Sequence, residues 1–421
     1  MKNAQNLIKF IKSSPTPYHA VDTVKSALLR AGYTEVSEAD IGSFSDGGRH
    51  FTVRGGSSLI AFCGSGEGFS IAASHCDTPA FKLKSDARAL AYCKLNVEKY
   101  GGAILYSWLD RPLSVAGRVA IDSEDGISIR LVNIDRDIAL IPSVAIHQNR
   151  SVNDGFSPNP AVDMLPLSGL DGDGVLELIA KELSVKKESI LSHDLFIYNR
   201  DEGRIVGEKE ELILSPRLDD LECVYASLEA FLQSSCGKAV QVLAIFDNEE
   251  VGSATKQGAG STFLSDTLEK ISGSRENYIK MLENSFMLSM DNAHAIHPNR
   301  PELSDSALAP TLGSGVTLKL NANQSYATDA VSAALVKKLA KTSGARLATY
   351  ASRADKPCGS TLGSIATTKA PVITADIGLP QLAMHSANET AAISDLSDMI
   401  ALVSAHFSSA IVKTADGYKI I

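Results

Sequence analysis

The sequence has no apolar run long enough to cross a lipid bilayer. Its longest uninterrupted apolar segments, such as Val242–Phe246, have the length of a strand, whereas a spanning helix needs roughly 20 residues. Met1–Ser13 intersperses leucine, isoleucine and phenylalanine with lysines, which predicts an amphipathic helix and not the continuous apolar core of a secretion signal. We therefore expect a soluble protein that is neither inserted into a membrane nor secreted.

An excess of basic residues is also missing. Forty Lys and Arg residues stand against 49 Asp and Glu residues, which gives a formal net charge of −9. General binding to nucleic acid or to anionic membranes therefore has no electrostatic basis. Small cations, including metal ions, remain possible ligands.

Cysteines are few and scattered. The six residues are Cys63, Cys76, Cys93, Cys223, Cys236 and Cys358. Because none forms a CxxC pair, the sequence predicts neither a disulfide framework nor a cysteine zinc site. This usage fits the reducing cytoplasm.

Several common catalytic motifs are absent. The sequence contains no Walker-type lysine loop, no Gly-x-Ser-x-Gly turn and no His-Glu-x-x-His pair. Gly313 and Gly315 lack a third glycine in register, which argues against a dinucleotide site. Cys358 can be a nucleophile, but glycine-containing loops often carry an inert cysteine.

The 421 residues, 44% of them hydrophobic and 21% charged, suffice for one large or two ordinary domains. Helices are predicted at residues 17–32, 219–233 and 326–342, and buried strands at 58–63, 69–73, 240–246, 286–290 and 371–377. Shorter alternating runs, at residues 117–122, 126–133 and 138–146, predict β-structure between them. We therefore predict an α/β domain, residues 1–87 and 217–421, that is interrupted by a β-rich domain at residues 88–216.

Three of the buried strands run into histidine or acidic residues at their carboxyl ends. These residues are His75 and Asp77, then Glu249 and Glu250, and then Asp291. Ligands of open α/β sheets bind beyond the carboxyl ends of strands, so the three positions can meet in one cleft. Together with His385 they supply the mixed nitrogen and oxygen donors that a pair of Zn²⁺, Mn²⁺ or Co²⁺ ions accepts.

Each of these motifs also has a purely structural interpretation. His75 can bind a metal while a nearby carboxylate accepts its other ring proton, but His-x-Asp is also a common turn or capping pair. In the pair Glu249-Glu250, one carboxylate can ligate a metal while the other deprotonates water. The same pair can instead be the acidic first turn of a helix, which the helix dipole favours.

Two further positions leave similar alternatives. Asp219-Asp220 opens a predicted helix, so either residue can be its N-cap, and either can instead bridge two metal ions. His385 has apolar neighbours and can be a structural histidine. The sum of the histidines and acids at strand ends favours the metal interpretation.

Five motifs in order carry a resemblance to a known family. They are Ser74–Pro79 (SHCDTP), Ser215–Asp220 (SPRLDD), Asp247–Ser253 (DNEEVGS), Asp291–Asn299 (DNAHAIHPN) and Met384–Ser386 (MHS). This set resembles the aspartyl aminopeptidases and their relative, the yeast vacuolar aminopeptidase I. The similarity runs from Ser14 to the C-terminal helix, and the compact chain is most similar to the bacterial cytoplasmic branch.

The resemblance implies a dinuclear metallopeptidase. Its α/β catalytic domain would have a mixed sheet, and the inserted β-rich domain would mediate dimerisation. Two divalent metal ions per subunit are implied, and we expect zinc, with manganese or cobalt as alternatives. The implied ligands are His75 and Asp291 for one ion, Glu250 and His385 for the other, and Asp219 between them. Asp77 would orient His75, and Glu249 would be the general base and acid.

Two segments resemble substrate-binding motifs of the family. They contain His147, in the inserted domain, and Lys319 with Tyr326, in the catalytic domain. Lys319 would pair with an acidic side chain at the first position of the substrate. His147 would stabilise the oxyanion in the active site of a neighbouring subunit. The alternatives are an exposed lysine and a strand-end histidine with a structural role.

The function predicted from the sequence is removal of an N-terminal Asp or Glu from short peptides with a free N-terminus. Removal of neutral residues such as Leu is the alternative within the same chemistry, and a non-catalytic assembly protein is the alternative outside it. The resemblance also implies a cytoplasmic homo-oligomer, a dodecamer built from dimers.

Overall fold

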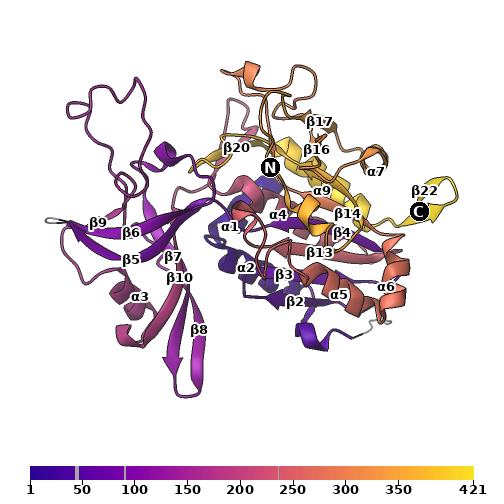
Figure 1. Ribbon diagram of the computed structural model, residues 1–421, viewed down its shortest axis with the longest axis horizontal. Coiled ribbons are helices and arrows are strands. Elements are labelled where there is room, and N and C mark those ends of the chain that lie inside the picture. Colours follow the sequence, from indigo (N-terminus) through magenta and orange to yellow (C-terminus); the bar gives the residue numbers. More distant parts are fainter. Residues whose placement is uncertain (43–46, 90–91, 236) are drawn as a thin grey trace.

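The computed structural model describes residues 1–42, 47–89, 92–235 and 237–421 of the chain. Two units lie side by side in Figure 1, a larger one around a nine-stranded sheet and a smaller one around a six-stranded sheet. The larger unit is formed by both ends of the sequence, and the smaller unit by a central segment. The chain is therefore an α/β protein with a β-rich insertion.

The nine-stranded sheet is mixed. Its strand order is β1-β2-β3-β13-β4-β14-β18-β16-β17. The strands are β1 (Thr34–Glu35), β2 (His50–Arg54), β3 (Ser58–Cys63), β4 (Phe69–His75), β13 (Val240–Phe246), β14 (Phe286–Met290), β16 (Val316–Leu320), β17 (Leu347–Ala351) and β18 (Ile373–Gly378). The central strands β13, β4, β14 and β18 are parallel, whereas β3 and β16 run antiparallel to their neighbours β13 and β18.

Helices cover both faces of this sheet, which explains the mostly apolar sequences of its central strands. One core contains residues of α1 (Lys2–Lys12), α2 (Pro17–Arg30), α4 (Leu218–Gln233), α7 (Ala330–Ser343) and α9 (Ile393–Phe407). The opposite core contains residues of α5 (Phe263–Ser272), α6 (Arg275–Leu282) and α8 (Leu362–Ala366). In β3, Leu59 and Ala61 belong to the first core and Ile60 and Phe62 to the second.

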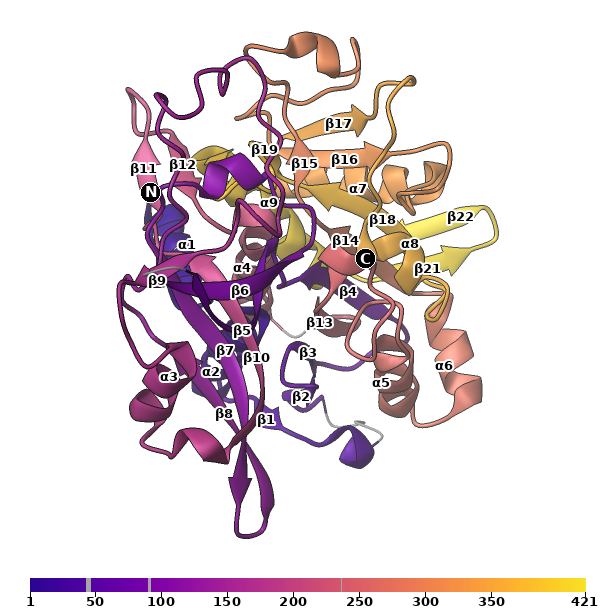
Figure 2. The ribbon, with the colours of Figure 1, turned by 60° about the vertical axis from the view of Figure 1, so that its left-hand side comes forward.

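The six-stranded sheet of the insertion is antiparallel throughout. Its order is β8-β7-β10-β5-β6-β9. The strands are β5 (Ala80–Ala89), β6 (Tyr92–Tyr100), β7 (Leu113–Ser123), β8 (Gly126–Asn133), β9 (Leu167–Gly169) and β10 (Ile190–Asn199), and α3 (Val175–Leu183) contributes to the same core. Figure 2 shows this sheet in front of the larger unit.

Two smaller sheets and several short 3₁₀ helices complete the described structure. A five-stranded sheet has the order β11-β12-β20-β19-β15, and β21 pairs with β22 near the C-terminus. These strands are β11 (Arg204–Val206), β12 (Leu212–Ser215), β15 (Ala293–His294), β19 (Pro380–Leu382), β20 (Glu389–Ala392), β21 (Ile411–Thr414) and β22 (Gly417–Ile420). Short 3₁₀ helices are η1 (Glu38–Asp40), η2 (Leu105–Trp108), η3 (Lys187–Ser189), η4 (Glu249–Val251) and η5 (Pro301–Leu303).

Two predicted elements need correction. Residues 138–146 do not form a strand: Ala139 and Leu140 make isolated bridges to different strands, and Pro142 then removes a backbone N–H donor. The helix predicted from residue 326 begins at Ala330, because the Asp329 carboxylate caps it by accepting the Ser332 N–H at 2.8 Å.

Two expectations from composition concern the whole chain. Among the described residues, no helix combines the length and apolarity needed to cross a membrane. Cys63, Cys76, Cys93, Cys223 and Cys358 are thiols in the structure, and Cys236 lies outside the described residues.

Candidate metal centre

The edge where β4, β13 and β14 end brings the predicted residues together. These three strands are parallel neighbours, so their carboxyl ends lie at one edge of the sheet. His75 is the last residue of β4, and Asp291 directly follows β14. After β13, Asn248 adopts a left-handed conformation (φ 63°), which turns the chain into η4 with Glu249 and Glu250. The residues that follow these three strands therefore lie at one edge of the sheet, where the sequence placed them.

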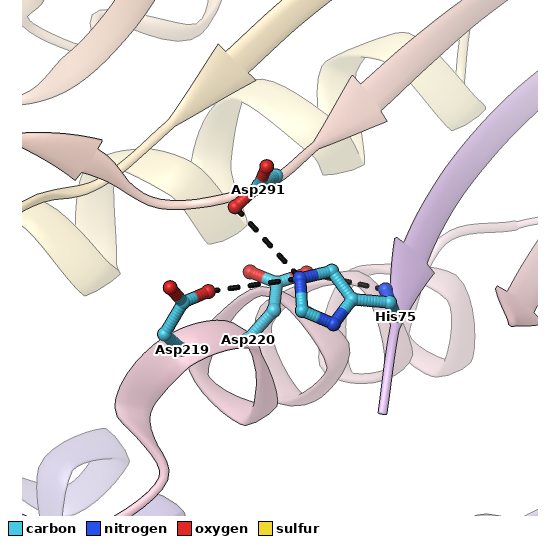
Figure 3. A group of neighbouring side chains, drawn as sticks. All are labelled: His75, Asp219, Asp220 and Asp291. Carbon is cyan, nitrogen blue, oxygen red and sulfur yellow. Dashed lines mark hydrogen bonds and ion pairs between the residues drawn. The ribbon is translucent and has the colours of Figure 1, made fainter. Parts of the chain in front are cut away.

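The first group of donors contains His75, Asp219, Asp220 and Asp291, all buried. Figure 3 shows them converging from the end of β4, the start of α4 and the end of β14. The His75 Nε2 atom lies 3.6 Å from Asp219 Oδ1 and 3.8 Å from Asp291 Oδ1. Asp220 instead directs Oδ2 to the backbone N–H of His75, at 3.2 Å.

The second group contains Asp219, Glu250 and His385. His385, in the loop between β19 and β20, places Nε2 3.5 Å from Asp219 Oδ2 and 3.4 Å from Glu250 Oε1. Asp219 therefore directs Oδ1 toward His75 of the first group and Oδ2 toward His385 of the second. This is the arrangement expected of a carboxylate shared by two ions.

The donors fit divalent cations such as zinc. Two ligand atoms at about 2.1 Å from one tetrahedral Zn²⁺ are about 3.4 Å apart, close to the 3.4 to 3.8 Å measured between donors in these groups. Asp219 Oδ1 and Asp220 Oδ1 are buried and accept no hydrogen bond. A buried carboxylate oxygen without a partner is costly, and a cation beside it removes that cost.

The concentration of acids shifts several pKa values. Burial raises the pKa of Glu249 to about 7, and the carboxylates of Asp291 and Asp77 add to this, while His75 opposes it. Burial also raises the pKa of Glu250 well above its usual value, with repulsion from Asp219 second. Burial alone would raise the pKa of Asp291, but Lys319 and His75 lower it to about 2. Mutual repulsion of this kind favours a bound cation.

Asp77 contacts more than His75. His75 Nδ1 lies 3.1 Å from the Asp77 carbonyl oxygen and 3.4 Å from its carboxylate. The same carboxylate accepts the backbone N–H groups of Glu249 and Glu250, at 3.0 and 3.1 Å. Asp77 is fully buried and therefore fixes the η4 turn as well as the histidine.

A cavity of about 190 Å³ joins both groups. Its lining comprises His75, Asp219, Glu249, Glu250, Asp291, Asn292, Ala293, His294, Lys319, Tyr326, Gly359, Ser360, Thr361, Met384 and His385. Eight of the ten predicted site residues thus share this wall, and Asp77 lies buried behind it. His147 is exposed on the loop after Ile141, in the inserted unit, and among the described residues it does not line the cavity.

Lys319 is buried in the wall of this cavity. Its Nζ lies 3.5 Å from Asp291 Oδ2 and 5.3 Å from the centre of the Tyr326 ring. Burial would lower the pKa of Lys319, but Asp291 and Asp376 raise it above its usual value. The ammonium is therefore charged and partly neutralised by a candidate ligand.

The insertion reaches this site within the same chain, which the sequence did not predict. The Tyr100 hydroxyl, at the end of β6, donates to Asp77 Oδ2 at 2.7 Å and accepts from Asn248 Nδ2 at 2.9 Å. The carbonyl of Gly102 lies 3.3 Å from His385 Nδ1. A Cβ atom at Gly101 or Gly102 would lie 3.1 Å from Glu250 or His385, so the segment is packed against both.

Comparisons with known proteins agree with this geometry. Residues 10–407 match the family described as aminopeptidase I zinc metalloprotease (M18). A probable M18 family aminopeptidase 2 from Clostridium acetobutylicum is 44% identical over 413 residues, which cover 92% of this chain and 95% of the relative. A cryo-EM structure of the Ape4 and Nbr1 complex aligns with a TM-score of 0.92 at 35% identity, covering 96% of this chain and 85% of that one. A structure of the mApe1 dodecamer of S. cerevisiae aligns with a TM-score of 0.83 at 27% identity, covering 96% of this chain and 96% of that one.

Proposed function

The chain belongs to the M18 family of zinc aminopeptidases, and from this premise we propose that it removes N-terminal Asp or Glu from short peptides. The observation that carries the acidic preference is the position of Lys319. Among the described residues that line the cavity, Lys319 is the only lysine or arginine. Its Nζ lies 3.5 Å from Oδ2 of the candidate ligand Asp291. An acidic side chain entering the cavity can pair with this ammonium.

The ligand assignment is part of the proposal. His75 and Asp291 would hold one zinc ion, Glu250 and His385 would hold the other, and Asp219 would contribute to both. Bound zinc supplies Lewis-acid polarisation of the scissile carbonyl and a lowered pKa of water. The proposal is supported by the two donor groups that share Asp219.

Glu249 is the proposed general base and acid. It lines the cavity beside His75 and Asp291 but belongs to neither donor group. Its carboxylate is therefore available to take a proton from water and to deliver it to the leaving amine. The surrounding carboxylates, meanwhile, favour the positively charged N-terminus of a peptide over a blocked one.

Removal of neutral residues remains the second candidate. The specific observation in its favour is the ion pair between Lys319 and Asp291, which uses part of the lysine's charge before any substrate enters. In that case Lys319 would support Asp291 and contribute nothing to selectivity.

The first experiment compares release of the N-terminal residue from matched Asp-, Glu- and Leu-initiated peptides, with a chelator-treated control. Lys319→Ala should lower kcat/KM for acidic substrates about 10- to 100-fold more than for the Leu substrate, because a charge-assisted contact of about 1.5 to 3 kcal/mol is lost. Lys338→Ala, an exposed lysine on α7, is the matched control. Equal losses on all three substrates would remove the acidic assignment and favour the neutral one.

A Glu249→Gln variant distinguishes an enzyme from a non-catalytic assembly protein. It should retain zinc but lose kcat by about 10² to 10⁴, because the proton acceptor is gone. The measurements are kcat and zinc content on the same preparation. Undiminished turnover would reject Glu249 as the base, and no release by the unmodified protein with any metal would favour the non-catalytic reading.

The proposal extends to assembly and location. We infer a homo-oligomer in which the inserted domain, residues 88–216, makes dimer contacts and exposed His147 enters a neighbouring active site; a dodecamer is the expected size. Support comes from the solved dodecamer of the yeast relative. Native mass spectrometry tests it, and a monomer at working concentration would contradict it. A cytoplasmic location is inferred from the sparse, scattered cysteines of the sequence.

A further inference from the structure

A buried carboxylate behind the second donor group connects two of its members. Glu389 is the first residue of β20 and is 2% exposed. Its Oε2 accepts the backbone N–H of Asp219 at 3.0 Å, and its Oε1 accepts the backbone N–H of His385 at 2.7 Å. Both oxygens of one side chain are therefore used by the backbones of two candidate zinc ligands.

These contacts join parts of the chain that are far apart in sequence. Asp219 lies at the start of α4, 170 residues before Glu389, whereas His385 lies four residues before it in the loop that follows β19. Their side chains approach to 3.5 Å in the second donor group. The pairing of β12 with β20, which places Ser215 opposite Glu389, brings these two parts of the chain together, and the Glu389 carboxylate then contacts both backbones from which these side chains extend.

Other contacts hold the His385 loop without reaching Asp219 itself. The His385 carbonyl accepts the N–H of Ile104 at 2.9 Å. Asn199 Nδ2 donates to the carbonyl of Ala387 at 2.7 Å. Both anchors belong to the inserted part of the chain. Asn199 also accepts Arg217 Nη1 through its carbonyl at 3.2 Å, just before α4, but neither anchor contacts the backbone of Asp219, as Glu389 does.

We propose that Glu389 is a positioning residue that sets the relative placement of Asp219 and His385, and thereby the zinc affinity of the second group. This inference rests on the proposed assignment of those two residues as ligands. A glutamine cannot replace Glu389, because both contacts need an acceptor and an amide offers only one oxygen. The amide NH₂ would face an N–H donor instead.

The chain supplies a matched control. Asp395, on the first turn of α9, also clamps two backbone N–H groups, those of Gly313 at 2.7 Å and Gly315 at 2.9 Å. It is 1% exposed and does not belong to the described lining of the cavity. Asp395→Asn therefore disturbs an equivalent clamp that touches no candidate ligand.

The test compares the unmodified protein with the variants Glu389→Gln and Asp395→Asn. Zinc affinity is measured by competition with a chromogenic chelator, and Tm, kcat and KM are measured on the same preparations. In Glu389→Gln we expect one of two zinc ions to bind about 10- to 100-fold more weakly, as is typical when a group that orients a ligand is removed. We expect kcat to fall by a similar factor with KM nearly unchanged, and excess zinc to restore part of kcat. Asp395→Asn should have a lower Tm but unchanged affinities for both zinc ions.

Two outcomes would overturn the inference: two tight zinc ions with normal kcat in Glu389→Gln, or an equal loss of zinc affinity in both variants. If Glu389→Gln fails to fold, Glu389→Asp is measured, since it keeps both acceptor oxygens but is one methylene shorter, and unaltered zinc affinity there would count against the role. Absence of peptidase activity in the unmodified protein would overturn the proposed function instead, and the ratio of zinc affinities would still decide the role of Glu389.

Discussion

Hydrogen bonds between buried carboxylates and backbone N–H groups organise the candidate centre residue by residue. Asp77 holds Glu249 and Glu250, and Glu389 holds Asp219 and His385. A carboxyl group has two acceptor oxygens, so each of these side chains can hold two backbone N–H groups at once. The residues that would bind zinc are therefore held in place through their main chain as well as through the metal.

Tyr100 is the outermost member of this network and gives a prediction at this scale. Tyr100→Phe removes the hydroxyl that donates to Asp77 and accepts from Asn248. We expect unfolding free energy to fall by about 1 to 3 kcal/mol, because buried polar partners lose a bond, and kcat to fall as η4 loosens. Denaturant unfolding and kcat measure the two effects.

The control for this change is Tyr198→Phe. The Tyr198 hydroxyl donates to Asn133 at 2.7 Å inside the inserted sheet. This variant should lose stability while keeping kcat. A drop in kcat as large as that of Tyr100→Phe would show that loss of any buried hydroxyl in the insertion impairs the enzyme, and would contradict a specific role for Tyr100.

At the scale of elements, the sequence predicted best where one physical cause dominated. Strands β3, β4, β13 and β14 are buried on both faces, so their sequences are mostly apolar and their ends could be located. The rule that ligands gather at carboxyl ends of parallel strands then led to the acids and histidines. The motif resemblance supplied the proposed division of those residues between two ions.

Contacts set by the tertiary fold could not be predicted in this way. Glu389 reaches Asp219 across 170 residues and Tyr100 reaches Asp77 across 23, and no periodicity or spacing records such bonds. The run at residues 138–146 alternates like a strand, yet it crosses the end of the inserted sheet and stops at Pro142. Local pattern therefore located the donors but not the groups that hold them.

Helix α9 carries a prediction about pH. His406 is 3% exposed, its Nε2 lies 3.0 Å from the Ile71 carbonyl, and burial lowers its pKa to about 4. Its usual pKa is about 6.5, so between these values the unfolded chain binds a proton that the folded chain does not. The free energy of unfolding should therefore decrease as pH falls from about 6.5 to 4, by about 1.4 kcal/mol per pH unit from this residue.

Replacement by a side chain that does not titrate isolates this contribution. His406→Gln should be less stable at neutral pH, but its stability should depend less steeply on pH in this window. Denaturant titrations of the zinc-loaded proteins at several pH values provide the comparison. Parallel curves for the two proteins would contradict the assignment.

At the scale of the whole molecule, the donors come from β4, α4, η4, the end of β14 and the loop after β19. A ligand that binds only the folded chain stabilises it, by about 4 kcal/mol when free ligand exceeds its Kd a thousandfold. Chelation should therefore lower Tm by several degrees, and added zinc should restore it. Scanning calorimetry measures this, and Asp219→Ala, which lacks the shared carboxylate, should respond little. An unchanged Tm on chelation would argue against zinc at these residues.

The contact of Tyr100, Gly101 and Gly102 with the donors has a consequence for engineering. The insertion resembles a detachable module in Figure 1, with its own sheet and its own core. Excising it would nevertheless remove the Tyr100 hydroxyl that donates to Asp77 and the Gly102 carbonyl that lies beside His385. A minimal peptidase would have to retain this short segment or replace it with a graft of the same backbone path. The insertion has a sheet of its own, but the candidate metal centre depends on contacts that the insertion makes.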